Sequence, residues 1–120
     1  MKYLLLIYED ESVYGPDKDS AAMAEVVAKH MALGPKLGAA RLGGAGLQNT
    51  PNATTVRTTG GRQTVHDGPF AETKEQLGGY YLVEVPDLDA AVEIARRIPL
   101  YKDGAIEVRP LLGQGERKAG

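Results

Sequence analysis

The residues best suited to acid–base chemistry in this chain are its two histidines and an aspartate. His30 and His66 are the only histidines, and Asp67 comes directly after His66. An imidazole with an ordinary pKa of about 6.5 exchanges a proton readily at neutral pH, so His30 is a candidate general base or acid. Asp67 could orient that imidazole or act as a base itself. Structural alternatives stay open for both residues. His30 could be buried and bonded to a backbone carbonyl, or partly exposed at the edge of a helix stripe, and Asp67 could be a turn residue before Gly68-Pro69.

A predicted hairpin gathers positive charge on one of its faces. Thr54–Thr59 and Arg62–His66 are rich in β-branched residues and alternate in character. Gly60-Gly61 between them supplies a two-residue turn with positive φ, which places Thr59 opposite Arg62. Val56 and Val65 then lie on one face of the hairpin. The residues that share the other face are Arg57, Arg62 and His66.

Arg57 is the candidate residue for holding an acidic ligand, because a guanidinium binds the paired oxygens of a carboxylate or the oxygen of a phenolate. The alternative is a salt bridge from Arg57 to Glu72 or Glu75. Glu72 and Lys74 belong to a polar segment that either borders a pocket or forms a solvated face. Tyr81 could bond a ligand oxygen at a pocket rim, or pack in the core or at a dimer interface. Phe70, the only phenylalanine, is expected to fill the core.

Composition excludes several classes of function. The net charge of −2 argues against general nucleic-acid binding, which needs an excess of cations. The chain has no cysteine, so disulfides, cysteine-ligated metals and thiol catalysis are excluded, and its histidines are too few for a His-rich metal site. The longest apolar run, Leu4–Ile7, is far too short to span a membrane. Gly43–Gly46 lacks the following Lys-Ser/Thr of a phosphate-binding loop.

A helix must position His30. Apolar residues recur three and four positions apart from Met23 to Gly34, which predicts an amphipathic helix with His30 in the middle of its buried stripe. Ser20 or Asp19 can cap its N-terminus, and Pro35 should end or kink it near Gly34. A second helix is expected between its cap, Asp87, and Pro99.

Strands are expected on either side of these helices. Lys2–Tyr8 is apolar in both alternating phases, as expected of a central strand covered on both sides. Further strands are predicted at Arg41–Leu47, Gly79–Val85 and Ala105–Pro110. Because the glycines of the first of these cannot fill the space beneath the first helix, we expect a gap there, lined by both His30 and Arg57.

The element order β, α, β, hairpin, β, α, β predicts a ferredoxin-like α+β fold of the dimeric α/β-barrel type. It has one sheet, two helices on one face, and the hairpin as an insertion. A single domain should cover residues 1–112, followed by a flexible tail at residues 113–120. Two helices cannot cover both faces of so apolar a sheet, so we expect a homodimer that buries the other face.

The segment Val65-His66-Asp67-Gly68-Pro69-Phe70-Ala71-Glu72-Thr73-Lys74-Glu75 resembles the signature of the YCII-related family, in its branch of DGPF-domain proteins. The resemblance continues from Met1 to about Leu112. It implies a dimeric ferredoxin-like fold, while most members of this branch have no assigned activity. The wider family includes an enzyme that dechlorinates a chlorinated hydroxyhydroquinone, and its better-studied branch has a His–Asp pair whose histidine matches His30. The stretch that matches the aspartate, Ala39–Gly46, contains no acid here, so Asp67 would have to replace it.

These observations predict a cytoplasmic homodimer with a pocket for a small anionic or phenolic ligand. If the protein is an enzyme, we expect lyase- or isomerase-like acid–base chemistry without a cofactor. His30 would move the proton, Asp67 would orient or share it, and Arg57 would hold the anion. The alternative is a non-catalytic module that senses a ligand or binds a partner in transcription, since some members of the branch are encoded near alternative sigma factors. Neither nucleic acid nor a membrane is an expected partner.

Overall fold

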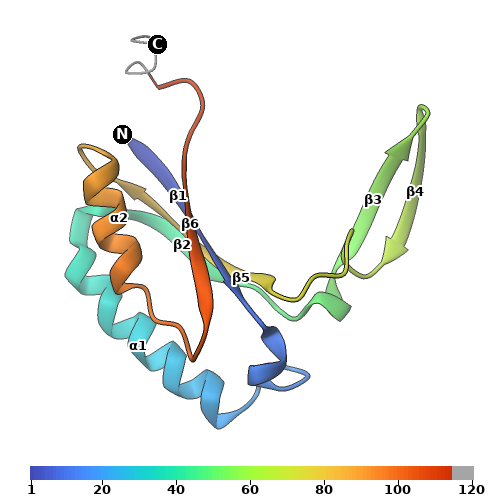
Figure 1. Ribbon diagram of the computed structural model, residues 1–120, viewed down its shortest axis with the longest axis horizontal. Helices are drawn as coiled ribbons and strands as arrows, with labels where there is room; N and C mark the ends of the chain where they lie inside the picture. The colour runs from blue at the N-terminus through green and yellow to red at the C-terminus, as the bar shows by residue number, and fades with distance from the viewer. Residues whose placement is uncertain (115–120) are drawn as a thin grey trace.

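The structure is a computed structural model that describes residues 1–114 (Figure 1). Three short 3-10 helices lie in this range: η1 (Glu11–Tyr14), η2 (Gly38–Ala40) and η3 (Thr50–Asn52). The other elements are, in order, β1 (Lys2–Glu9), α1 (Ala21–Leu37), β2 (Arg41–Gly46), β3 (Thr54–Thr59), β4 (Arg62–Asp67), β5 (Gln76–Glu84), α2 (Leu88–Arg97) and β6 (Gly104–Pro110). The chain is therefore a mixed α+β protein.

The main sheet is antiparallel, with its strands in the order β2-β5-β1-β6. β1 lies inside the sheet, where Leu5 pairs with Tyr81 of β5 on one side and with Val108 of β6 on the other. A strand in this position needs apolar residues in both phases, which explains the continuous apolar run at the start of the chain.

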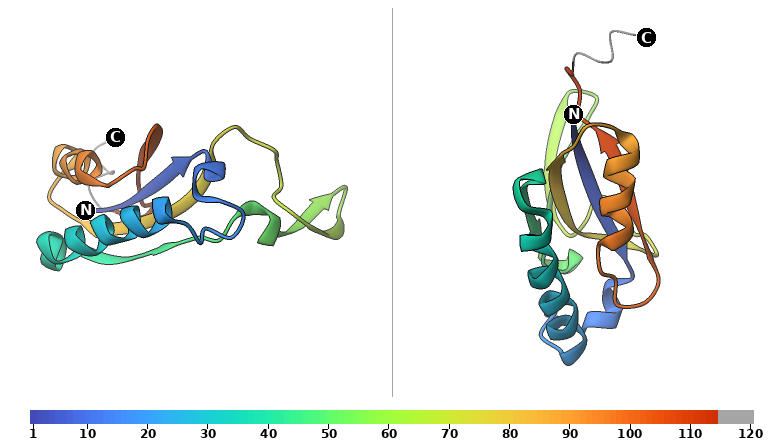
Figure 2. Two further views of the ribbon diagram at one scale, coloured as in Figure 1. Left: turned by 90° about the horizontal axis from the view of Figure 1, so that it is seen from below. Right: turned by 90° about the vertical axis from the view of Figure 1, so that its left-hand side faces the viewer.

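Both α1 and α2 pack on the same face of this sheet (Figure 2). Alternate residues of β1 and β5 point to that face and are buried, with Leu5 and Val83 fully inaccessible. The helix residues buried against them are Leu33 and Leu37 of α1 and Ala91 and Ile94 of α2, together with Ile98 directly after α2. The predicted placement of both helices on one face is confirmed.

The opposite face of the sheet has no helix over it in the described chain. Its apolar side chains are half-buried and form what we call the open face: Leu4, Leu6, Tyr8, Tyr80 and Leu82. Coverage of β1 on both sides, as its sequence predicts, is therefore not achieved within one copy of residues 1–114.

Helix α1 begins and ends differently from its prediction. Of the two candidate caps, Ser20 is the one used, and its Oγ accepts a hydrogen bond of 3.1 Å from the Met23 amide. The helix does not end near Gly34 but continues through Pro35 to Leu37. Gly34 permits this, because a residue without Cβ relieves the clash that normally keeps the position before proline out of the helical region.

The residues of α1 that are buried also differ from the predicted stripe and lie mainly in the C-terminal half of the helix. Val26, Leu33 and Leu37 are buried, whereas Met31, predicted to face the sheet, is 72% exposed. His30 lies at the edge of the buried stripe and is half-buried. The second helix follows its prediction more closely, since Asp87 caps it by accepting a 2.9 Å bond from the Ala90 amide.

The hairpin of β3 and β4 forms a separate sheet, which we call the arm (Thr54–Asp67). Its register is the predicted one, with Thr55 opposite His66, Arg57 opposite Thr64 and Thr59 opposite Arg62. Figure 1 and the left view of Figure 2 show the arm projecting from the body, away from both helices. The hairpin is an insertion, as expected, and its strands pair only with each other and not with the main sheet.

Part of the predicted tail at residues 113–120 is described. Gln114 is held against β1, because its Nε2 donates 3.0 Å bonds to the carbonyls of Lys2 and Leu111. Residues 115–120 lie outside the described residues.

Strand β2 supplies a sharp test of this packing. A Cβ atom at Gly44 would lie 2.7 Å from the Tyr80 carbonyl oxygen, whereas one at Gly43 would meet nothing within 4 Å. We predict that Gly44→Ala lowers the free energy of unfolding by about 1–3 kcal/mol. Gly43→Ala should leave it within about 1 kcal/mol of the parent. Urea unfolding of both variants checks this, and equal effects would contradict the close approach of β2 and β5.

Candidate active site

A cavity of about 340 Å³ lies between α1 and the main sheet. Ile7 of β1 and Met23 and Val26 of α1 give it an apolar wall. The glycines that line it are Gly34, Gly46, Gly78 and Gly79. Because these residues have no side chains, helix and sheet cannot fill the space between them, and the predicted gap beneath α1 is present.

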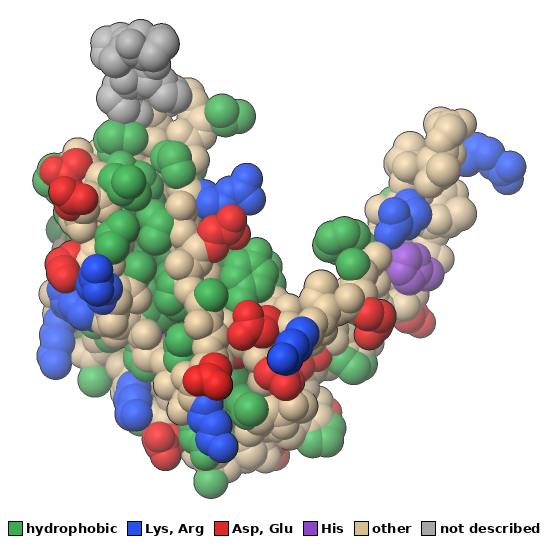
Figure 3. All heavy atoms as spheres, viewed as in Figure 1, with side chains coloured by type: hydrophobic (Ala, Val, Ile, Leu, Met, Phe, Trp, Pro, Cys, Tyr) green, Lys and Arg blue, Asp and Glu red, His purple; other side chains and the backbone are tan. Residues whose placement is uncertain are grey.

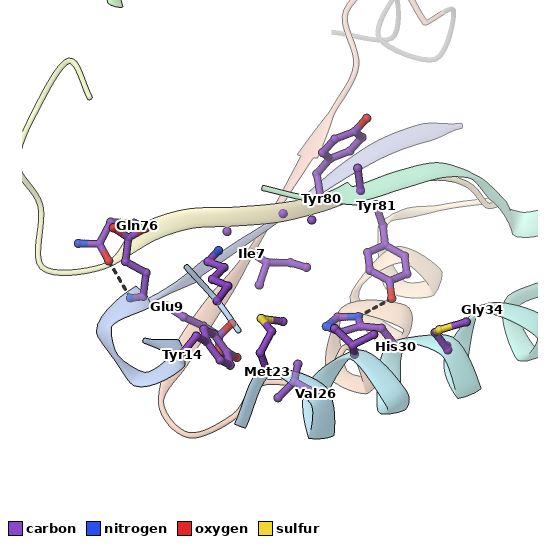
Figure 4. A pocket seen from close by; sticks show the side chains of 18 of the residues that line it. Ile7, Glu9, Tyr14, Met23, Val26, His30, Gly34, Gln76, Tyr80 and Tyr81 are labelled. Carbon is purple, nitrogen blue, oxygen red and sulfur yellow. Dashed lines mark hydrogen bonds between the residues drawn. The ribbon is translucent and has the colours of Figure 1, made fainter. Parts of the chain in front are cut away.

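The central polar contact of the cavity joins His30 of α1 to Tyr81 of β5 (Figure 4). His30 Nδ1 lies 2.6 Å from the Tyr81 hydroxyl oxygen, and the two ring centroids are 5.7 Å apart. Successive side chains of a strand point to opposite faces, so Tyr81 points to the helix face and its neighbour Tyr80 to the other one. Figure 4 shows the Tyr80 ring on the side of the sheet away from His30. Two of the predicted site residues are thus in direct contact.

Burial shifts the proton affinities of both members of this pair. It lowers the pKa of His30 below its ordinary value of 6.5, and the charge of Glu9 and the nearby Pro99 carbonyl oppose that shift only in part. Burial raises the pKa of Tyr81, while the positive charge of Arg41 acts in the opposite direction. At neutral pH the pair is therefore a neutral imidazole beside a neutral phenol.

Arg41 brings a positive charge to the same end of the cavity. It is the first residue of β2, and its guanidinium carbon lies 5.5 Å from the centroid of the Tyr81 ring. The side chain also lines the cavity. A guanidinium in this position can attract an acidic oxygen to the Tyr81 hydroxyl.

The other end of the cavity contains a buried carboxylate. Glu9 is only 7% exposed, and its Oε2 accepts bonds of 2.6 Å from the Tyr14 hydroxyl and 3.0 Å from the Tyr101 amide. Neither of these bonds uses Oε1. Burial and the hydrogen bond to Glu9 raise the pKa of Tyr14 strongly, so its hydroxyl stays a donor.

A network of hydrogen bonds joins the cavity wall to the root of the arm. Lys18, Glu11 and Gln76 line the cavity. Lys18 Nζ donates to the Leu47 carbonyl at 2.7 Å, and the Glu11 carboxylate accepts from the Thr50 amide at 3.1 Å. Gln76 in turn accepts from the Glu11 amide at 2.8 Å. Hydrogen bonds therefore connect residues of the cavity wall to Leu47 and Thr50, in the segment that leads into the arm, although neither of these two residues lines the cavity.

Arg57 and Asp67, in contrast, lie on the arm and do not line this cavity. Asp67 is exposed at the end of β4, opposite Thr54. Arg57 forms neither of the salt bridges considered for it among the described residues; its Nη2 donates to the Phe70 carbonyl at 3.0 Å. The expected shared cavity of His30 and Arg57 is therefore not found within one chain, because the arm is not part of the main sheet.

The remaining predicted residues of the connector after the arm are also away from the cavity. Glu72 and Lys74 are exposed and are not among its lining residues. Phe70 does not fill the core as expected but is 74% exposed. Within residues 1–114, no three acidic or histidine side chains come together as a metal site, and no helix is long and apolar enough to cross a membrane.

Three site residues were not predicted from the sequence: Glu9, Tyr14 and Arg41. Glu9 had a usable signal, because it continues the inward phase of β1 after Tyr3, Leu5 and Ile7, so that a period of two places its carboxylate on the helix face. The predicted strand ended one residue earlier, at Tyr8, because Glu9 is followed by the acidic residues Asp10 and Glu11. Arg41 and Tyr14 offered no comparable signal, because their contacts depend on how β2 and η1 lie against the sheet.

Comparison with known proteins identifies the family. Residues 1–113 match the YCII-related domain. The chain belongs to the YCII-related family. It is also 41% identical, over 119 residues, to an uncharacterized protein of Rhizobium meliloti (strain 1021), and the match covers 92% of each chain. As the relative is uncharacterized, the chemistry of this YCII-related protein has to be argued from the cavity itself.

The buried Glu9–Tyr14 bond can be tested by removing one hydroxyl. Tyr14→Phe leaves a buried carboxylate without its side-chain donor and should lower the free energy of unfolding by about 2 kcal/mol. Tyr8→Phe is the matched control, because the Tyr8 hydroxyl lies 3.4 Å from the exposed carboxylate of Glu107. We expect the control to change stability by less than about 0.5 kcal/mol. Equal losses in urea unfolding would contradict a special role for the Glu9–Tyr14 pair.

Proposed function

We propose that this YCII-related protein binds a small phenolic or anionic molecule in the cavity beneath α1 and moves a proton through Tyr81 and His30. The observation that carries the proposal is the 2.6 Å contact between His30 Nδ1 and the Tyr81 hydroxyl in the cavity wall. The cavity volume of about 340 Å³ suits a molecule of one ring, at the lower end of the roughly 300–1,000 Å³ usual for small-molecule sites.

The direction of proton transfer follows from the surroundings of the imidazole. In the neutral ring we assign the hydrogen to Nε2 and the lone pair to Nδ1, because an unprotonated Nδ1 can accept from the Tyr81 hydroxyl that lies 2.6 Å away. The Tyr81 hydroxyl then donates to Nδ1. A ligand hydroxyl that donates to the Tyr81 oxygen loses its proton as Tyr81 passes its own to Nδ1. The products are a ligand oxyanion and an imidazolium.

Arg41 stabilises that oxyanion, because its guanidinium lies over the Tyr81 ring at the same end of the cavity. Return of the proton from His30 to a different ligand atom completes an isomerase- or lyase-like reaction, with no cofactor needed for this transfer. In this proposal Tyr81 and Arg41 take the ligand-binding role, and His30 keeps the role of base. Asp67, Arg57, Glu72 and Lys74 could contribute only if a second chain brought them to the cavity.

The proposal includes a homodimer that buries the open face. The strand order β2-β5-β1-β6, with helices on one face, supports a ferredoxin-like arrangement of the dimeric α/β-barrel type. The segment Asp67-Gly68-Pro69-Phe70 supports membership of the DGPF branch. The cytoplasmic location expected from the sequence is part of the same proposal.

A second candidate function is a non-catalytic module that binds a partner, as the link of this branch to transcription suggests. The observation that favours it is the exposure of apolar side chains on and beside the arm, among them Val65 and Phe70. In that case the cavity would serve ligand sensing and His30 would transfer no proton.

The probes 4-nitrophenol and nitrobenzene, which differ by one hydroxyl, test the proposed function. We predict that the parent protein binds 4-nitrophenol at least tenfold more tightly than nitrobenzene, and that Tyr81→Phe reduces this ratio to about threefold or less. Tyr80→Phe, on the other face of the same strand, should leave the ratio unchanged. Equilibrium dialysis measures the affinities.

Absorbance of the bound probe separates catalysis from binding. If His30 is the base, the ionised fraction of bound 4-nitrophenol should be larger in the parent than in His30→Gln at the same pH. An unchanged ionised fraction in His30→Gln would favour the non-catalytic alternative. Equal binding of both probes by the parent would contradict the phenolic site altogether.

A further inference from the structure

The arm is the part of the molecule that packs least against the rest of its own chain. All its residues are exposed except Thr55, and Figure 3 shows it standing apart from the body with basic side chains and a histidine on its surface. An isolated two-stranded hairpin is marginally stable in water, and a third strand or a packed face is normally required. Within the described chain the arm has neither a third strand nor a packed face.

The arm is nevertheless held in a defined shape at its root. The Gly68 amide donates to the Ala53 carbonyl at 2.7 Å, and the Thr55 hydroxyl donates to the Gly68 carbonyl at 2.7 Å. The bond from Arg57 to the Phe70 carbonyl then fixes the chain leaving the arm. These contacts present a shaped surface and do not tie the arm to the body.

One face of the arm is suited to packing against another protein surface. Val56 and Val65 are paired across the strands and are 58% and 68% exposed, and Phe70 beyond the root is 74% exposed. The opposite face contains Arg57, Arg62 and His66 and is suited to water. The face with the two valines also carries Thr54 and Asp67 at the root and Thr58 and Gln63 near the turn, so its apolar part is the exposed Val56–Val65 pair. An exposed apolar pair of this kind is suited to contact with a partner surface.

We propose that the apolar face of the arm packs on a second copy of this chain and clasps the homodimer. This inference rests on the dimer of the proposed function and adds the surface that holds it together. The chain itself presents an uncovered partner surface, the open face, and symmetry requires that each copy both gives an arm and receives one.

The interface area supports a second copy as the occupant. The open face spans about 20 Å by 20 Å, or roughly 400 Å², which is half of the roughly 800 Å² that each partner buries in a standard interface. One face of the arm adds roughly 200 Å², and the strip of body beneath the partner's arm adds about as much again. Docking of the arms therefore enlarges the contact that the open face alone would make and brings it closer to the size of a standard interface.

Charge also favours this pairing. The arm carries Arg57 and Arg62 against Asp67, a net charge of +1, so the rest of the chain carries −3 of the total of −2. A positive arm and a negative body attract between copies and orient their encounter. Lys18 and Glu11 of the cavity wall hydrogen-bond to Leu47 and Thr50 in the segment that leads into the arm, so docking of the arm in the dimer would also restrain these contacts.

Sedimentation equilibrium of the full chain tests the clasp with one variant on each surface. Val65→Asp places a charge on the apolar face of the arm without touching the core, and Thr64→Asp places the same charge at the next position, on the opposite face. Leu6→Asp places it on the open face. We expect a dimeric parent, dissociation at least tenfold stronger in Val65→Asp, a change of less than threefold in Thr64→Asp, and a monomer for Leu6→Asp. Circular dichroism checks that each variant is folded.

The outcomes separate the clasp from the dimer. A parent that stays monomeric at 100 µM would overturn both the dimer and the clasp, and would indicate that the arm binds a different protein. A dimeric parent whose dissociation constant is the same in Val65→Asp and in Thr64→Asp, while Leu6→Asp dissociates, would overturn the clasp and leave the dimer. If Val65→Asp and Thr64→Asp weakened the dimer equally, the effect would be one of added charge and not of the valine face, and the clasp would also be overturned.

Discussion

The glycines of the sheet beneath α1 are the constraint on which the rest of this structure depends. Where β2 and β5 pass under the helix, several positions are glycine, and at Gly44 a Cβ atom would lie 2.7 Å from a backbone oxygen of the neighbouring strand. The two strands can therefore pair closely, but they offer little bulk to fill the space toward α1. The cavity of about 340 Å³ is the consequence, and polar side chains can enter it without displacing core residues.

Two sets of hydrogen bonds in the cavity wall differ in how firmly they are held. Glu9 is held by Tyr14 and the Tyr101 amide, so the buried carboxylate is stabilised by donors that do not leave it. His30 and Tyr81 hydrogen-bond to each other, and burial disfavours the charged form of each. The first set is thus a fixed part of the wall, while the second can gain or lose a proton when a ligand changes its surroundings.

The sequence predicted local structure well and long-range placement poorly. The hairpin register, the cap at Asp87 and the helix around His30 follow from turn chemistry and periodicity, which act over a few residues. His30 and Tyr81 were each identified as candidate site residues because both belong to strongly patterned elements, and the gap beneath α1 followed from the glycines of the sheet. The contact of His30 with Tyr81 was not predicted. The position of Arg57 and Asp67 could not be predicted, because the sequence of a hairpin does not determine whether it pairs with the main sheet or projects from it. Glu9 was missed because its acidic neighbours obscured the strand period.

The central claim, a neutral His30 that accepts a proton from the Tyr81 hydroxyl in a ligand cavity, is tested most directly by ¹⁵N NMR of the imidazole. At neutral pH the claim predicts a protonated Nε2 and an unprotonated Nδ1, with a pKa below the ordinary 6.5. Addition of 4-nitrophenol should shift the Nδ1 signal toward the protonated form, and Tyr81→Phe should abolish that response. A hydrogen on Nδ1 in the free protein, with no response to the probe, would contradict the claim.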